Sequence, residues 1–474
     1  MGVKSFRAKA CVHPCCFASH IVQMRNSAGQ GMGVRKDCRP STERHDDLKI
    51  IQLTPGAGGM YCGNCFRDNA LVTEFRRSGH DALMVPLYLP LTLDEANQAE
   101  GTPIFFGGLN VYLSQKFKLF RRTPGWLRKL FNAGFIMRSV GRMAGKTRGE
   151  DVGELTLSML RGEEGNQVRE LEQLVSWLKE HHRPDVICLS NALLIGMARR
   201  LREALGVPVV CLLEGEDAFL DSLPSPEREE SWEEIRRRVT DVSLFIAPSR
   251  YYADVMAERA AIPRERLAQI YNGINLDGFR LSKLPDAPPV LGFFTRMCPE
   301  KGLDTLVDAY ISLRQTERVP GLKLAVGGGC QPMDDPFVAE QKDKLRAAGL
   351  MGDATFQPNI DREAKLRFFR QLTVLSVPAL YGEAFGLYVV EAMASGVPVV
   401  APEDASFPEM IAETGAGVIC EKGSAEALAK AIGDLLSDRE RLAKCAEAGR
   451  TAVEATFNIQ QMAEAYLERL AKLG

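Results

Sequence analysis

From Leu48 onwards, short apolar runs alternate with segments of helical periodicity. An apolar run over 48–53 ends in a glycine-rich turn, a helical pattern covers 66–79, and a second apolar run spans 80–90. A strand, a helix and a strand in this order are typical of a parallel sheet, because parallel strands need a crossover connection. The same alternation returns over 184–213 and 243–275. The pattern predicts an α/β domain built on a doubly wound sheet.

A proline-rich polar stretch, 281–289, separates this series from a second one. The second series has a helical pattern over 302–315 and strand-like runs over 290–296, 322–329, 373–379 and 396–402. We therefore predict two doubly wound, Rossmann-like α/β domains that face each other across a cleft. Ligands of such sheets bind beyond the carboxyl ends of the strands, so the cleft is the expected site.

The composition excludes some classes of protein. The 474 residues carry 59 basic and 61 acidic side chains, and this balance gives no reason to expect a nucleic-acid partner. No apolar run reaches the roughly 18–20 residues that span a bilayer. Among the twelve cysteines, Cys188, Cys211 and Cys420 lie in strand-like runs, as free thiols do. These features favour a reducing compartment, and we expect a cytoplasmic protein.

Two segments depart from the alternation. Residues 1–46 are basic, contain Ser and Gly and lack the apolar core of a secretory signal, so we expect a disordered extension or untranslated sequence. Their Cys and His residues match no standard zinc spacing, and no metal site is expected. Residues 115–148 are basic with interleaved aromatic residues. Three interpretations stand: a helix packed on its own domain, a lid over an acceptor, or a peripheral membrane contact.

Two glutamates, Glu383 and Glu391, stand eight positions apart in a strand–loop–helix pattern. We expect the helix to begin near Gly386, so that its first N–H groups suit a phosphate. Carboxylates accept hydrogen bonds from sugar hydroxyls, and the pair would then flank a diphosphate. In the alternative, Glu383 caps the helix and Glu391 lies on a solvated face.

Cations for the same cleft are predicted at Arg296, which ends a strand, and at Lys301, which precedes a helix. In the first domain, Gly56, Gly58 and Gly59 follow the first strand, where a backbone must approach a ligand closely. They do not complete the dinucleotide fingerprint G-x-G-x-x-G.

Taken together, these motifs resemble a known family. The segments "GEAFGLYVVEAMASGVPVVA", "TRMCPEKG", "YNGINLDGF" and "APSRYYAD" occur in the order found in retaining glycosyltransferases of family 4, which have the GT-B fold. The first half, with "TPGAGGMYCGN" and "PIFFGGLNVYL", is also similar to the glycogen and starch synthase branch. The resemblance covers residues 48–472.

The resemblance implies domains, roles and a reaction. It implies an acceptor-side domain over 47–280, a nucleotide-sugar-binding domain over 281–456, and a helix over 457–474 that crosses back onto the first domain. It implies diphosphate binding by Arg296 and Lys301 and donor-sugar contact by Glu383. The remaining donor-binding positions that it implies are Glu391 at the ribose, Phe385, Gly386 and Leu387 at the phosphates, and Gly58 and Gly59 from the other domain.

Two features depart from the family pattern. Many members carry a histidine where Glu214, Glu216 and Asp217 follow a strand here, so one of these carboxylates could contact the sugar or acceptor, or all three could be surface residues. Cys62 and Cys65 form a C-x-x-C pair in the glycine-rich loop, for which packing thiols are favoured over a redox motif.

The resulting hypothesis is a retaining glycosyltransferase. It would move a sugar from a nucleotide-diphosphate sugar to a hydroxyl of a glucan, a sugar or a lipid-linked acceptor, with no cofactor required. UDP, GDP and ADP stay open as the donor nucleotide. The alternative is a non-catalytic sugar-nucleotide-binding or scaffold protein of the same fold.

Overall fold

The computed structural model describes residues 47–56, 62–91, 93, 95–106, 149–281 and 288–473. The chain divides into two units, Met1–Arg44 and His45–Gly474, and every described residue belongs to the second unit. The predictions for 1–46, for 115–148, and for Gly58 and Gly59 fall outside the described residues.

The first lobe is built on a parallel six-stranded sheet with the order β2-β1-β3-β4-β5-β6. Alternate residues of a strand point to opposite faces. Accordingly, Ile51 and Leu53 pack into one apolar cluster and Ile50 into another. Its strands are β1 (Lys49–Thr54), β2 (Asp81–Pro86), β3 (Val186–Leu189), β4 (Val209–Leu212), β5 (Leu244–Ala247) and β6 (Leu267–Gln269).

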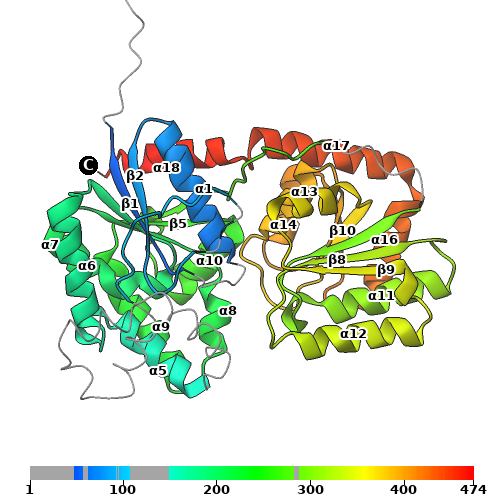
Figure 1. Ribbon diagram of the computed structural model, residues 1–474, viewed down its shortest axis with the longest axis horizontal. Helices are drawn as coiled ribbons and strands as arrows, with labels where there is room; N and C mark the ends of the chain where they lie inside the picture. Colours follow the sequence, from blue (N-terminus) through cyan, green and yellow to red (C-terminus); the bar gives the residue numbers. More distant parts are fainter. Residues whose placement is uncertain are drawn as a thin grey trace, which may run out of the picture. The chain divides into compact units, whose positions relative to one another are not determined.

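Helices cover both faces of this sheet (Figure 1). Within the alternation over 184–213, the segment between the two strands starts as a 3-10 turn, η4, and continues as α7. Gly196 lies there against the backbone of Met159, where a Cβ would be 2.1 Å from a carbonyl oxygen. The helices are α1 (Gly63–Arg77), α5 (Gly149–Leu160), α6 (Val168–His181), α7 (Ala198–Leu205), α8 (Glu216–Asp221), α9 (Glu227–Arg238) and α10 (Arg250–Arg259), with 3-10 turns η3 (Gly162–Glu164), η4 (Ala192–Met197), η5 (Val239–Asp241) and η6 (Arg264–Arg266).

The second lobe repeats this design with the strand order β12-β11-β10-β7-β8-β9, again all parallel. Its strands are β7 (Val290–Phe294), β8 (Lys323–Gly328), β9 (Ala354–Pro358), β10 (Val374–Ser376), β11 (Val399–Pro402) and β12 (Gly417–Cys420). Its helices are α11 (Leu303–Gln315), α12 (Asp335–Ala347), α13 (Arg362–Arg370), α14 (Leu387–Ala394), α15 (Phe407–Thr414), α16 (Ala425–Ser437) and α17 (Arg439–Ala455), with 3-10 turns η7 (Pro299–Lys301) and η8 (Met351–Asp353).

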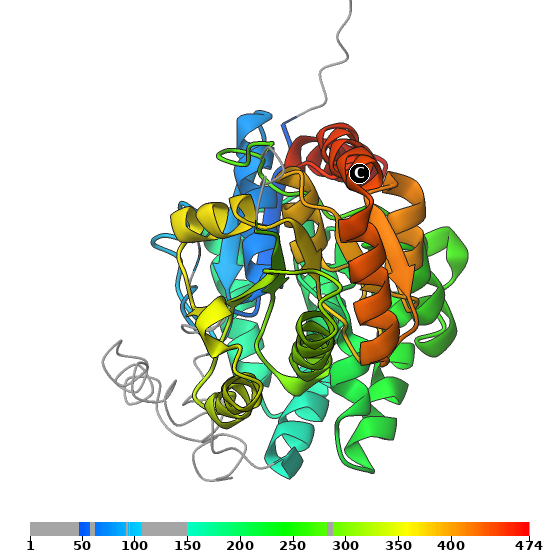
Figure 2. The same ribbon diagram turned by 90° about the vertical axis from the view of Figure 1, so that its right-hand side faces the viewer.

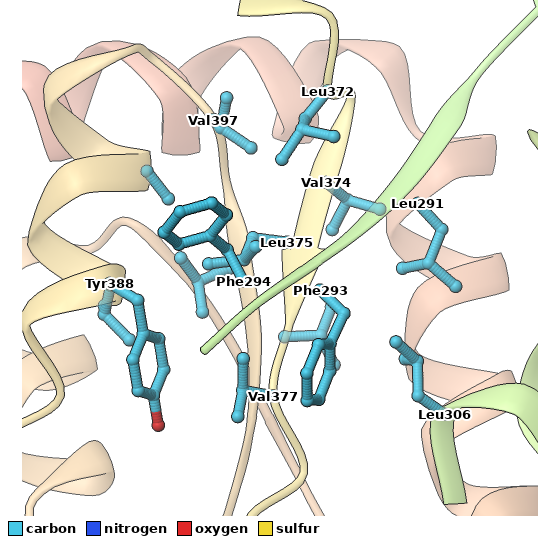
Figure 3. Packing of buried hydrophobic residues seen from close by; sticks show 14 of the residues in the cluster. Leu291, Phe293, Phe294, Leu306, Leu372, Val374, Leu375, Val377, Tyr388 and Val397 are labelled. Carbon is cyan, nitrogen blue, oxygen red and sulfur yellow. The ribbon is translucent and has the colours of Figure 1, made fainter. Parts of the chain in front are cut away.

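The core of the second lobe lies on both faces of its sheet, and Figure 2 shows helices on both sides. Figure 3 shows Phe293 and Leu306 on one side of β7, with Phe294 and Tyr388 on the other. Because both faces of β7 are covered, its residues Leu291 to Phe294 are all buried. The prediction of two doubly wound α/β domains is therefore confirmed.

The last helix, α18 (Ile459–Leu470), packs on the first lobe although it follows the second lobe in sequence. Asn458 caps it by accepting a hydrogen bond from the N–H of Gln461 at 2.9 Å. Met462 and Tyr466 join the apolar cluster that contains Ile50, and α18 contacts α1 (Figure 1).

Candidate active site

A cavity of about 290 Å³ lies at the carboxyl ends of the strands, with walls from both lobes. In each sheet the strand order reverses at one point, between β1 and β3 in the first and between β7 and β10 in the second. Ligands of open α/β sheets bind at such reversals. Eight of the predicted site residues line this one cavity: Glu214, Arg296, Lys301, Glu383, Phe385, Gly386, Leu387 and Glu391.

Lys301 and Glu383 form an ion pair in the cavity wall. The Nζ atom of Lys301 donates to Oε2 of Glu383 at 2.5 Å, and the two side chains are 12% and 15% exposed. The hydroxyl of Tyr388 donates to the same oxygen at 3.2 Å. Burial acts to lower the pKa of Lys301, but the charge of Glu383, the neighbouring Tyr381 and the hydrogen bonds to both together raise it, so the ammonium stays charged. Glu383 thus bonds a lysine and a tyrosine and does not cap α14.

Glu391 forms a second buried ion pair with a different lysine. The Nζ atom of Lys365, on α13, donates to Oε1 of Glu391 at 2.7 Å, and the side chains are 6% and 10% exposed. Both residues line the cavity. The alternative that Glu391 lies on a solvated helix face does not hold.

The N-terminus of α14 faces the same cavity. The helix begins at Leu387, one residue after the predicted start, and Gly386 is its N-cap with φ of +87°. A glycine at this position offers no side-chain oxygen to the first turn, whose N–H groups have no partner within the helix. Since Gly386 and Leu387 line the cavity, this end is suited to an anion.

Arg296 lines the cavity while Asp334 holds its guanidinium. Its Nε and Nη2 atoms donate to the two carboxylate oxygens of Asp334 at 3.2 and 2.9 Å. These hydrogen bonds raise the pKa of Arg296, which burial acts to lower. The side chain is still 46% exposed, so part of the guanidinium remains open to a ligand.

The wall from the first lobe carries Glu214, which follows β4. Arg67 of α1 donates to Oε1 of Glu214, and Asn272 donates to the same oxygen at 3.0 Å. Arg67 also donates to Asp68 at 2.6 and 2.9 Å and is itself buried. Burial raises the pKa of Glu214, against the effect of Arg67. The result is a fixed carboxylate at the cavity, backed by a buried guanidinium.

Glu216 and Asp217 stand elsewhere, since the described residues that line the cavity do not include them. Glu216 is buried and accepts hydrogen bonds from the N–H of Ala192 at 2.7 Å, the N–H of Glu214 at 2.9 Å and the hydroxyl of Tyr252 at 2.7 Å. It fixes the loop that presents Glu214. Asp217 follows it in the first turn of α8.

Cys62 is the N-cap of α1 and accepts a hydrogen bond from the N–H of Cys65 at 3.3 Å. Both are free thiols, and Cys65 is fully buried. The thiols sit at the start of the helix that brings Gly63 and Arg67 to the cavity.

Lys365, Arg67 and Asn272 are cavity residues that the sequence analysis did not single out. Arg362 is another, and it pairs at 2.9 Å with Glu95 of the first lobe. One signal was available for Lys365: it shares the apolar face of α13 with Phe368 and Phe369, where a lysine is unusual.

Among the residues that the structure describes, no group of His, Cys, Asp and Glu is arranged to hold a metal ion. The same residues contain no helix long and apolar enough to cross a membrane.

The fold and this site define a GT-B protein with a ligand cavity between two Rossmann-like lobes. Residues 279–452 match the family model "Glycosyl transferases group 1", and residues 139–277 match "Glycosyltransferase Family 4". The chain belongs to the GT-B glycosyltransferases of the family-4 type, as the sequence motifs indicated.

Three known proteins illustrate the similarity. A GDP-mannose-dependent alpha-(1-6)-phosphatidylinositol monomannoside mannosyltransferase of Mycolicibacterium smegmatis is 29% identical over 234 residues, which are 46% of this chain and 59% of that protein. The match thus spans little more than half of this relative's length.

Two solved structures share the fold at 18% identity. Sucrose-phosphate synthase from Thermosynechococcus elongatus has a TM-score of 0.65, and the match covers 90% of this chain and 99% of that one. HepE of Anabaena, in complex with UDP and glucose, has a TM-score of 0.61 with 90% and 100% covered.

Proposed function

We propose that this chain is a retaining glycosyltransferase that moves a sugar from a nucleotide-diphosphate sugar to a hydroxyl acceptor. One observation carries the proposal. The ammonium of Lys301, the open end of α14 and the carboxylates of Glu383 and Glu391 line one cavity at the strand reversal of the second sheet. Cationic and N–H groups suit a diphosphate, and carboxylates suit the hydroxyls on either side of it.

In this proposal each residue has a chemical task. Lys301, Arg296 and the N-terminus of α14 offset the negative charge that builds up on the leaving diphosphate. Glu391 accepts hydrogen bonds from the ribose hydroxyls, and Glu383 contacts the donor sugar. In this proposal Lys301, Arg296 and the N-terminus of α14 offset the charge of the diphosphate without a metal.

The donor class draws support from the relatives. The mycobacterial relative is described as GDP-mannose-dependent, and the HepE structure holds UDP and glucose. A nucleoside diphosphate is common to both. The acceptor would enter from the first lobe, past Glu214, and a carbohydrate or lipid-linked hydroxyl is proposed.

Retention would follow from transfer on one face of the sugar. The bond between the anomeric carbon and the phosphate oxygen breaks, the acceptor oxygen bonds to the same face, and the leaving phosphate takes the acceptor proton. The ion pair of Glu383 with Lys301 supports a carboxylate that orients the sugar rather than one free to attack it.

The cysteines bear on the cellular compartment in which the protein works. Cys188 and Cys211 are buried in the first sheet as free thiols, which agrees with a reducing compartment. We propose the cytoplasm. Contact with a membrane through 115–148 belongs to the same proposal and would be tested by vesicle binding.

The test is nucleotide release from a panel of UDP-, GDP- and ADP-sugars. Wild type should hydrolyse one donor slowly, and Lys301→Ala and Glu391→Ala should lower that rate by about 100-fold or more. Lys430→Ala and Glu440→Ala, whose side chains are 72% and 79% exposed, are the matched controls and should behave as wild type. With an acceptor in hand, proton NMR of the product gives the anomeric configuration.

Two outcomes would count against the proposal. A wild-type protein that binds a nucleotide sugar but never releases nucleotide, with or without acceptors, would favour a non-catalytic binding protein. A protein that binds none of the panel would favour a scaffold.

A further inference from the structure

Lys365 is a buried cation inside the cavity to which the proposed reaction gives no task. Its side chain is 6% exposed, and its Nζ atom donates to Oε1 of Glu391 at 2.7 Å. It comes from α13, whereas Glu391 comes from α14. The ring of Phe66, from the first lobe, lies 5.9 Å from the same Nζ atom. The pair thus stands where the two lobes meet.

A buried lysine is costly, because an ammonium loses its hydration when it leaves water. A carboxylate that pairs with it offsets part of this cost and is held in a fixed orientation. Each carboxylate oxygen can accept two hydrogen bonds, so Glu391 retains acceptor capacity on Oε2 after bonding Lys365 through Oε1. An oriented anion of this kind suits two neighbouring hydroxyl groups.

We propose that Lys365 is a positioning residue for the nucleotide. It holds Glu391 in a fixed orientation and aims the second carboxylate oxygen, Oε2, at the 2′- and 3′-hydroxyls of the donor's ribose. The role rests on the proposed function, since it takes a ribonucleotide as the ligand. The two lysines of the cavity then have different tasks. Lys301, paired with Glu383, binds the diphosphate, and Lys365 acts on the ribose through Glu391.

The geometry favours this role over direct contact with a phosphate. Lys365 is less exposed than Lys301, at 6% against 12%, and its Nζ atom donates to the carboxylate assigned to the ribose. Arg362 lies one turn earlier on α13, and its pair with Glu95 ties that helix to the first lobe. Lys365 is therefore held on a helix that is fixed on both sides of the cavity.

The experiment measures how well the protein distinguishes ribose from deoxyribose. Calorimetry would give the Kd of UDP and GDP, and of their 2′-deoxy and 3′-deoxy analogues. Wild type should bind the ribonucleotide about 10- to 100-fold more tightly, because a hydrogen bond to a charged group usually changes Kd by about this factor. Lys365→Met should weaken the ribonucleotide about 10-fold or more and leave the deoxy analogues nearly unchanged, so that the preference falls towards unity.

Four further variants make the test specific. Lys365→Arg should recover part of the preference, because it restores a cation. The double variant Lys365→Met/Glu391→Gln should lose no more preference than Glu391→Gln alone. Arg367→Met, a 65% exposed position on the same helix, is the matched control and should keep the wild-type preference.

The outcomes separate this inference from the proposed function. If wild type prefers ribonucleotides and Lys365→Met keeps that preference, the positioning role is overturned and the proposed function stands. Equal weakening of ribo and deoxy ligands would instead assign Lys365 to the phosphates or to folding, and would also overturn it. A wild type that binds no nucleotide would overturn both.

Discussion

At the scale of single residues, two carboxylates of the cavity each form an ion pair with a lysine of their own. Glu383 pairs with Lys301 and Glu391 pairs with Lys365, and all four side chains are at most 15% exposed. Buried ion pairs often stabilise a fold less than apolar residues of similar size would. Two of them at one cavity therefore point to binding or catalysis rather than to stability.

Glu214 offers a prediction at this scale. Glu214→Ala removes the carboxylate that bonds buried Arg67 and Asn272, and should lower the free energy of unfolding by about 2 kcal/mol, measured in urea. Glu172→Ala breaks an exposed pair with Arg200 and should cost less than about 1 kcal/mol. Similar losses in the two variants would contradict the view that Glu214 is needed to pair with buried Arg67.

Some of these residues could be predicted from the sequence and others could not. Arg296, Lys301 and Glu383 follow apolar strands, and parallel strands bring their carboxyl ends to one edge, so spacing alone places them together. The pairing of Arg67 with Glu214 joins residues 147 positions apart and depends on how α1 packs on the sheet. No local pattern contains that information.

At the scale of elements, short turns place the charged groups. The 3-10 turn η7 ends at Lys301, and Gly302, with φ of +72°, is then the N-cap of α11. A Cβ at Gly302 would lie 2.0 Å from the carbonyl oxygen of Pro378, in the loop that leads to Glu383. The close approach of these two loops brings Lys301 to Glu383. The sequence shows the glycine, but the neighbour that requires it is visible only in the fold.

The second prediction is that Gly302→Ala harms both stability and the site. Left-handed φ costs about 1–2 kcal/mol with a Cβ, and the clash with Pro378 adds to it, so the loss in unfolding free energy should exceed about 2 kcal/mol. Gly349→Ala is the matched control, because its φ is +71° but nothing lies within 4 Å of its Cβ. Gly349→Ala should lower the unfolding free energy only by the cost of the left-handed φ, and this variant should keep wild-type activity. If Gly302→Ala and Gly349→Ala lowered the unfolding free energy equally, the loops of Gly302 and Pro378 would not need their close approach.

A third prediction concerns pH and three helices of the first lobe. Asp221, which ends α8, accepts hydrogen bonds from Arg259 at 2.6 and 2.6 Å and from the indole of Trp232 at 3.1 Å. The bonds from Arg259 hold the pKa of Asp221 below its ordinary value. A lowered pKa in the folded state stabilises the fold above the unfolded pKa, near 4, and this gain is lost as the pH falls through the folded value.

The measurement is urea unfolding of wild type and Asp221→Asn between pH 2 and 7. The wild type should be more stable by less than about 1 kcal/mol at pH 6, because the carboxylate is 44% exposed and solvent screens it. The difference should shrink below pH 4. A difference that stays constant with pH would show that the charge of Asp221 does not contribute.

At the scale of the whole molecule, one chain builds two sheets and then returns to the first. The alternation of apolar runs with helical patterns predicts both sheets, because each pattern depends on neighbours in sequence. The contact between α18 and α1 joins two helices that are far apart in sequence, and only the family resemblance indicated it. The consequence is that the C-terminal helix, next in sequence to the second lobe, contributes to the stability of the first.

The last prediction tests this division by hydrogen exchange. Tyr466 of α18 is buried in the cluster with Ile50 and Met84, so Tyr466→Ala should cost about 3–5 kcal/mol and lower amide protection in β1, β2 and α1. Tyr310→Ala empties a comparably buried site in the core of the second lobe. It should lower protection in β7 and β8 and leave β1 protected. If Tyr466→Ala lowered protection equally in both sheets, the lobes would unfold as one cooperative unit, and the stability supplied by α18 would belong to the whole molecule rather than to the first lobe.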